Sequence, residues 1–129
     1  MKGTLYGVGV GPGDPELMTL KAVRMIRENE IIAVPGADVK ETVAYKIAVQ
    51  AVPELEEKEL LPIYMPMTHD AKKLEENHAK GAKALEACLD QGKNVVFLTL
   101  GDPCVYSTFS YLQHRVEADG YHTELVSGI

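Results

Sequence analysis

Two stretches of the 129-residue chain contain residues that could bind or react with a ligand, and each follows an apolar run. Residues 9–15 read GVGPGDP, and residues 99–108 read TLGDPCVYST. Glycine lets a ligand approach the backbone, proline holds a loop in one shape, and aspartate offers a carboxylate. In the second stretch these features meet at Gly101-Asp102-Pro103, which predicts an anionic site for a cationic group. The alternative is that Asp102 caps a turn or the following helix.

The glycines of the first stretch do not form a dinucleotide-binding fingerprint. A G-x-G-x-x-G pattern that starts at Gly7 or Gly9 would need its third glycine at Pro12 or Asp14. Pro12 lacks the N–H that a phosphate nest requires, and the carboxylate of Asp14 would repel a phosphate. These residues therefore argue against a phosphate loop and leave a rigid turn beside a ligand, or a purely structural glycine turn.

Alternating elements lead into the two stretches. Apolar runs bounded by turn residues predict five strands, near residues 4–9, 31–34, 58–63, 95–98 and 122–126. Apolar residues at helical spacing predict four helices, near residues 19–27, 42–51, 70–91 and 108–118. This alternation predicts an α/β fold with a mostly parallel five-stranded sheet, flanked by helices and joined by right-handed crossovers.

Local signals refine this fold. Thr42 is available to cap the second helix, and Gly92 is positioned to end the third. The continuous apolar run at residues 95–98 is typical of a strand buried on both faces, so we expect it at the centre of the sheet. Ligands of open parallel sheets bind outside the carboxyl ends of the strands, where we expect both stretches to lie.

Composition limits the classes of function. The length fits one domain, and a net charge of −6 without a basic cluster argues against a nucleic-acid partner. No apolar run approaches the roughly 18 residues of a membrane span, and no signal-peptide pattern opens the chain. We therefore expect a cytoplasmic protein with no membrane partner. Cys88 and Cys104 are expected to be reduced thiols, and the scattered histidines predict no metal site.

Three motifs together resemble the tetrapyrrole methylase family, S-adenosylmethionine-dependent enzymes that methylate uroporphyrinogen-derived macrocycles and that include diphthine synthase. The motifs are GVGPGDPELMTLKA near the start, VVFLTLGDPCVYSTF near the end, and YMPMTHD at residues 64–70. The last two resemble the branch of precorrin-2 or cobalt-factor II C(20)-methyltransferases of cobalamin biosynthesis. The resemblance covers essentially the whole chain.

The resemblance implies the organisation and the site. Family members are usually dimers with two α/β domains, and residues 1–129 resemble the N-terminal one, so we expect a homodimer and a C-terminal domain that this chain lacks. By similarity, S-adenosylmethionine would be bound by Leu100, Gly101, Asp102, Val105, Gly128 and Ile129. The tetrapyrrole substrate would lie against Pro12, Gly13, Asp14, Tyr106 and Ser107. No catalytic residue is assigned; the candidates for accepting the meso proton are Asp14 and Tyr106, with solvent or the substrate as alternatives.

Three hypotheses for function stay open at this point. The first is C-methylation of precorrin-2 or cobalt-factor II at the C(20) meso carbon. The second is another activity of the family, at a different macrocycle position or in diphthine synthesis, and the third is a non-catalytic α/β binding module. An acidic domain does not attract a polycarboxylate macrocycle over a long range, so we expect a local basic rim, with Lys21 and Arg24 as candidates. His69, Lys72 and Lys73 could also meet substrate carboxylates, or form a solvated helix face.

Overall fold

The computed structural model describes residues 2–10, 19–35, 40, 42–63, 70–100 and 103–126. Its strands are β1 (Thr4–Val10), β2 (Ile31–Pro35), β3 (Glu59–Ile63), β4 (Val95–Leu100) and β5 (His122–Val126). Its helices are α1 (Leu20–Glu28), α2 (Val43–Ala51), the 3-10 helix η3 (Pro53–Glu57), α3 (Ala71–Asp90) and α4 (Pro103–Ala118). Within the described ranges, the expected strands and helices are all present.

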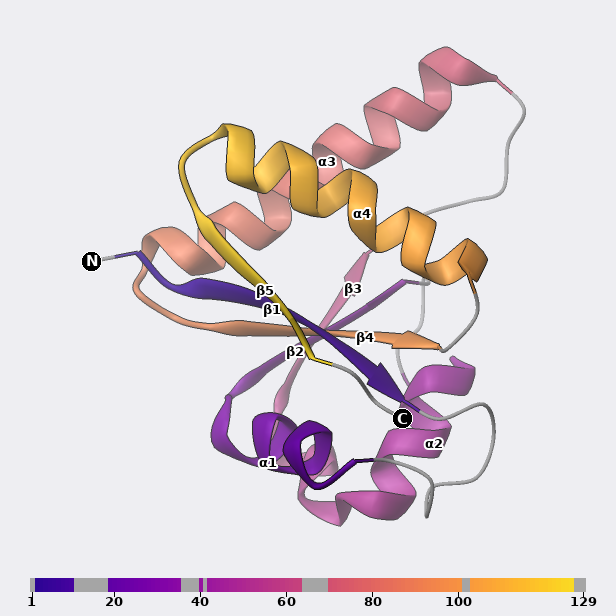
Figure 1. Ribbon diagram of the computed structural model, residues 1–129, viewed down its shortest axis with the longest axis vertical. Coiled ribbons are helices and arrows are strands. Elements are labelled where there is room, and N and C mark those ends of the chain that lie inside the picture. The colour runs from indigo at the N-terminus through magenta and orange to yellow at the C-terminus, as the bar shows by residue number, and fades with distance from the viewer. Residues whose placement is uncertain are drawn as a thin grey trace.

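All five strands lie in one parallel sheet with the order β3-β2-β4-β1-β5. The strand β4 is therefore central, as the continuous apolar run predicted. The chain steps from β1 to β2 to β3 in one direction along the sheet and then returns through β4 to β5. Crossovers of one hand place helices on opposite faces when the direction reverses. Figure 1 shows this arrangement, with α1 and α2 below the sheet and α3 and α4 above it.

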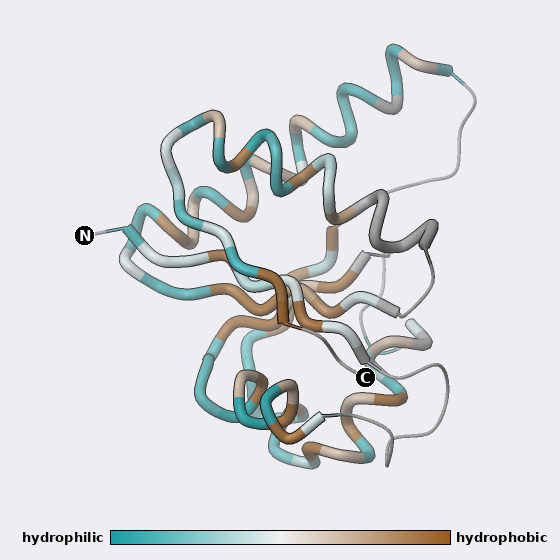
Figure 2. The backbone as a smooth tube through the Cα atoms, in the orientation of Figure 1, coloured by the Kyte–Doolittle hydropathy of each residue, from teal (hydrophilic) through white to brown (hydrophobic). Residues whose placement is uncertain are grey.

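Alternate strand residues supply the two cores. On the α1/α2 face, Val8, Val96 and Leu98 pack with helix residues such as Ile26 and Ala48. On the opposite face, the core consists of Leu5, Ile31, Ala33, Ile63, Val95 and Phe97 with Ala82, Leu85, Leu89, Phe109, Leu112 and Val116. In Figure 2 hydrophobic colour follows the strands and the inner sides of the helices, whereas hydrophilic colour lies outside. Burial of both faces explains why the strands are nearly continuous apolar runs.

The observed ends of the helices can be compared with the caps and boundaries that the sequence predicted. Thr42 caps α2 as predicted, since its hydroxyl accepts a hydrogen bond from the backbone N–H of Tyr45 at 3.2 Å. Gly92, which follows the end of α3, has a φ of 79°, a conformation that glycine adopts without strain. The expected start of the last helix near residue 108 is wrong, because α4 begins at Pro103. Proline suits the first helical position, where its missing N–H has no partner to lose.

One glycine in β1 allows α4 to pack closely on the sheet. A Cβ atom added to Gly7 would lie 2.4 Å from Cε2 of the Phe109 ring, well inside van der Waals contact. Phe109 is fully buried, and its ring lies 5.4 Å from that of Phe97 on β4. Gly7 is therefore required by helix packing, which is a different role from the turn glycines that follow β1.

Candidate functional site

Three neighbouring strands end side by side at the carboxyl edge of the sheet. Val10, the last residue of β1, is paired with Leu100, the last residue of β4. On the other side of β1, Val126 ends β5 opposite Val8. The segments that continue from these strands, at residues 11, 101 and 127, are those in which the sequence predicted ligand contacts. The described ends of β1, β4 and β5 therefore lie side by side at the points from which the three predicted segments continue.

The end of β4 is also the point at which the following helices change faces. The neighbours of β4 are β1 and β2, which are followed by α1 and α2 on one face, while α4 covers the other. In open α/β sheets such a change of face opens a crevice outside the strand ends, and ligands bind there. The topology thus favours the carboxyl end of β4 as the centre of a binding site.

The predicted site residues divide between the described part of the chain and the rest. Leu100 ends β4, and the backbone of Val105, Tyr106 and Ser107 lies in the first turns of α4. The other predicted residues lie outside the described residues: Gly101, Asp102, Gly128 and Ile129 for the donor, and Pro12, Gly13 and Asp14 for the substrate. Only two residues separate β4 from α4, so the first turn of α4 follows directly from the strand end.

Sequence reasoning missed Thr99, which is one residue before the end of β4. Its side chain is fully buried, and its hydroxyl donates to the carbonyl oxygen of Val8 at 3.5 Å, a long contact. The contact joins β4 to β1 at the edge that carries the predicted site. A signal was present in the sequence, because threonine is the only polar residue of the apolar run VVFLTL.

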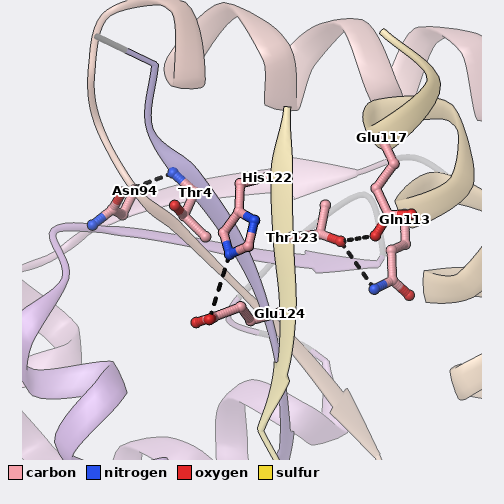
Figure 3. A network of polar contacts seen from close by, with 7 residues as sticks. All are labelled: Thr4, Asn94, Gln113, Glu117, His122, Thr123 and Glu124. Atoms are coloured by element: carbon pink, nitrogen blue, oxygen red, sulfur yellow. Dashed lines mark hydrogen bonds and ion pairs between the residues drawn. The ribbon is translucent and has the colours of Figure 1, made fainter. Parts of the chain in front are cut away.

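Polar contacts fix the edge strand β5 against α4. Figure 3 shows Gln113 of α4, whose amide donates to the Thr123 hydroxyl at 3.0 Å, and Glu117, whose carboxylate accepts from the same hydroxyl. At the N-terminal end of β1, the Thr4 N–H donates to the Asn94 side chain at 2.8 Å. These contacts hold β5 and β1 in place, and with them the strand ends at the candidate site.

The charges near these strand ends suit a cationic ligand. Residues 4–18, 95–110 and 119–129 contain no lysine or arginine, and the turns after β1 and β4 carry Asp14, Glu16 and Asp102. A sulfonium and an ammonium group are compatible with such a set, whereas these carboxylates would repel a triphosphate or pyrophosphate. Residues of this chain therefore fit S-adenosylmethionine better than they fit a nucleotide phosphate.

The predicted basic residues lie on the first turns of helices. Lys21 and Arg24 are exposed on α1, and Lys72 and Lys73 are exposed at the start of α3. The backbone N–H groups of Lys72 and Lys73 donate to the carboxylate of Asp70, which caps α3. Their contact with a substrate stays a prediction, and His69 lies outside the described residues.

Two further observations concern metal and membrane. In the part of the chain that the structure describes, no group of three or more histidine, cysteine, aspartate or glutamate side chains is arranged to hold a metal ion. Among the same residues, none of the helices has the length and apolar character needed to span a bilayer. Cys88 is a free, half-buried thiol, as expected, and burial raises its pKa.

A family model described as Tetrapyrrole (Corrin/Porphyrin) Methylases matches residues 4–129. The chain belongs to the tetrapyrrole methylase family. It is 38% identical over 126 residues to a probable cobalt-precorrin-2 C(20)-methyltransferase of Methanocaldococcus jannaschii, which covers 97% of this chain and 52% of the relative. It is 33% identical to a precorrin-2 C(20)-methyltransferase of Sinorhizobium sp, over 98% of this chain and 54% of the relative.

A solved structure of this methylase family has the same fold. The uroporphyrin-III C-methyl transferase of Thermus thermophilus, in complex with S-adenyl homocysteine, superposes with a TM-score of 0.65 at 29% identity. The match covers 98% of this chain and 48% of that one. The chain thus spans about half the length of the methylases that it matches.

Proposed function

We propose that this protein is the N-terminal domain of an S-adenosylmethionine-dependent methyltransferase of cobalamin biosynthesis. Its substrate would be precorrin-2 or its cobalt-loaded form, methylated at the C(20) meso carbon. The observation that carries this proposal is the 38% identity, over 97% of the chain, to a relative that bears that name. The second relative acts by name on metal-free precorrin-2, so both metal states of the substrate are included in the proposal.

The donor would bind at the carboxyl end of β4. We assign its contacts to Leu100, Gly101, Asp102 and Val105, with Gly128 and Ile129 joining from the strand β5 side. When bound, S-adenosylmethionine supplies a methyl group that its positive sulfonium already activates. The Asp102 carboxylate would attract the cationic part of the donor, and the glycines would let the backbone approach it closely. The adjacent ends of β1, β4 and β5 support this assignment.

The macrocycle would lie against the turn after β1 and the start of α4. Pro12, Gly13 and Asp14 would form one wall, and Tyr106 and Ser107 the other. Their task is to hold the meso carbon in line with the methyl group and the sulfur, since positioning supplies much of the rate in such a transfer. The methyl–sulfur bond breaks as the new carbon–carbon bond forms, and the meso proton then leaves. Asp14 or the Tyr106 phenol would accept it.

The substrate also carries many carboxylates, which an acidic domain repels as a whole. We assign the compensating attraction to the exposed cations Lys21 and Arg24 on α1, the helix that follows β1. Their attraction would weaken with added salt, because exposed charges are screened. A KM for the tetrapyrrole that rises with ionic strength, and rises less in Lys21→Gln/Arg24→Gln, is the expected result.

A transfer assay with ¹³C-methyl-labelled donor tests the proposal. Because we expect the isolated domain to be inactive, the full-length protein that contains residues 1–129 is incubated separately with precorrin-2, cobalt-precorrin-2, uroporphyrinogen III and a protein acceptor, and NMR then locates the label. Label at C(20) of either precorrin supports the proposal and identifies the metal state. Label on uroporphyrinogen III or on protein would assign the chain to another activity of its family, and binding of donor without transfer to any acceptor would contradict the proposed reaction.

A further inference from the structure

A second concave site lies between α3 and α4, apart from the strand ends that carry the proposed function. It has a volume of about 320 Å³ and is lined by Ala71, Glu75, His78, Tyr111, His114 and Arg115. That volume is at the lower end of the roughly 300–1,000 Å³ that is typical of small-ligand sites. We call it the α3/α4 groove.

One wall of the groove is a stacked pair of rings. The centroids of His78 and Tyr111 are 4.9 Å apart, and the ring planes differ by only 17°. His78 is 9% exposed. Tyr111, in contrast, is 58% exposed, which is unusual for a large aromatic side chain in a folded domain. The pair therefore presents a flat aromatic surface.

The mouth of the groove carries one positive charge that is weakly paired. The Arg115 guanidinium lies 4.0 Å from the nearest oxygen of Glu75, too far for a hydrogen bond, and the Glu75 side chain is 77% exposed. Such an exposed pair contributes little to stability, so a ligand can replace it at low cost. Burial, and then the charge of Arg115, lower the pKa of His78, so the stacked ring is neutral at physiological pH. His114 adds a further exposed imidazole to the lining.

We propose that the α3/α4 groove binds a small aromatic carboxylate. Its ring lies on the exposed face of Tyr111, and its carboxylate replaces Glu75 as the partner of Arg115. A guanidinium fork matches the geometry of a carboxylate and also stacks well on planar groups. A phosphorylated ligand carries more negative charge than a carboxylate and fits this set less well, because Arg115 is the only lysine or arginine among the described lining residues. The positive charge of Arg115 also disfavours a metal ion.

Benzoate is the probe for this proposal, and two matched compounds separate its features. Cyclohexanecarboxylate keeps the charge but loses the planar ring, and benzamide keeps the ring but loses the charge. We expect benzoate to shift the NMR signals of groove residues with a dissociation constant in the millimolar range, about −4 kcal/mol. Both matched compounds should bind more weakly. Equal affinity for all three, or no saturable shift with benzoate, would overturn the proposal.

Two substitutions at one ion pair should change the affinity for benzoate in opposite directions. Arg115→Gln should weaken binding about tenfold, which is 1.4 kcal/mol. Glu75→Gln should tighten it, because the competing carboxylate is removed. Arg27→Gln is the matched control, since Arg27 is also an exposed arginine with a glutamate partner, Glu54 at 3.3 Å, but lies on α1. Weakened binding in both the Arg115 and the Glu75 variants, or in the Arg27 variant, would contradict the assigned contact.

Discussion

The two helical layers that cover the sheet differ in the kinds of side chain that they place near the core. The α1/α2 layer packs on the strands with aliphatic side chains, and its buried polar residue Asn29 is bonded to the Met25 carbonyl at 2.7 Å. The α3/α4 layer has a similar apolar core but also places His78, Glu86 and Arg115 between its helices. The α1/α2 core is thus mostly apolar, whereas imidazole, carboxylate and guanidinium groups also lie beside the α3/α4 core. Because α4 follows β4 directly, the α3/α4 layer adjoins the candidate site.

The largest effect should come from the close contact of Phe109 with Gly7 in the α3/α4 layer. Phe109→Ala removes a fully buried ring and should cost about 3–5 kcal/mol of unfolding free energy. Gly7→Ala alone should also destabilise, because its new Cβ would lie 2.4 Å from that ring. In the Phe109→Ala background the same change should be nearly neutral, since the ring is gone. Urea unfolding of the two single variants and the double variant gives the coupling free energy.

Additive free energies in that cycle would show that the ring moves aside without cost, and the close contact would then be unimportant. Ile26→Ala provides the comparison in the α1/α2 layer, where a fully buried aliphatic side chain is removed. It should cost about 2–5 kcal/mol and show no coupling to Gly7→Ala, because Ile26 packs on the opposite face.

The next effect concerns the titratable groups of the α3/α4 layer. Burial first, and then the neighbouring carboxylates of Asp119 and Asp90, raise the pKa of Glu86 to about 7, although Arg115 opposes them. One oxygen of the Glu86 carboxylate is buried and has no hydrogen-bond partner among the described residues. The folded protein therefore binds a proton more tightly than the unfolded chain does. Stability should be greatest below pH 4.5 as far as this group is concerned, and should fall as the pH rises to 7 and above.

Glu86→Gln should remove this loss, because the neutral amide imitates the protonated acid. We expect the variant to melt a few degrees above the parent at pH 8 and close to it at pH 5. Glu76→Gln, an exposed change on the same helix, should leave the melting temperature unchanged at both pH values. A variant that is no more stable than the parent at pH 8 would refute the raised pKa.

The smallest expected effect is the loss of stability on removing a helix cap, and it should differ between the two layers. Thr42 caps α2 inside the packed α1/α2 layer, whereas Asp70 caps the start of α3, whose described core residues begin only at Ala82. Thr42→Ala should cost about 1 kcal/mol of global stability. Asp70→Ala should cost less globally, since the first turns of α3 can fray while the core remains folded. Hydrogen exchange should therefore quicken mainly in residues 71–77; a uniform increase over the domain would show that this helix end is not independent.

The sequence was sufficient for the strand and helix pattern because both faces of the sheet are covered, which makes the strands continuous apolar runs. It also located the central strand and the cap at Thr42. The start of α4 is not evident from the sequence, because residues 103–108 show weak helical spacing and Gly101-Asp102-Pro103 is equally typical of a loop. Contacts between distant segments, such as Gly7 with Phe109, could not be predicted, because they depend on how helices settle on the sheet.

The candidate site was predicted unevenly. The resemblance located the turns, and parallel topology explains why the ends of β1 and β4 lie together, since Val10 pairs with Leu100. Thr99 stands out as the polar residue of its apolar run, but its contact with Val8 depends on the pairing of β4 with β1, which the run alone does not specify. The α3/α4 groove could not be predicted either, because His78 and Tyr111 are 33 positions apart in sequence and meet only when two helices pack.

In the proposed function, the carboxyl end of β4 binds the methyl donor through Asp102. Calorimetric titration of the protein with S-adenosylhomocysteine tests it, comparing Asp102→Asn with Glu28→Gln, an exposed acidic residue at the end of α1. S-adenosylhomocysteine lacks the sulfonium but keeps the ammonium group and the adenosine. We predict that the Asp102 variant binds about tenfold more weakly and that the Glu28 variant binds like the parent. Unchanged affinity in the Asp102 variant would contradict the claim.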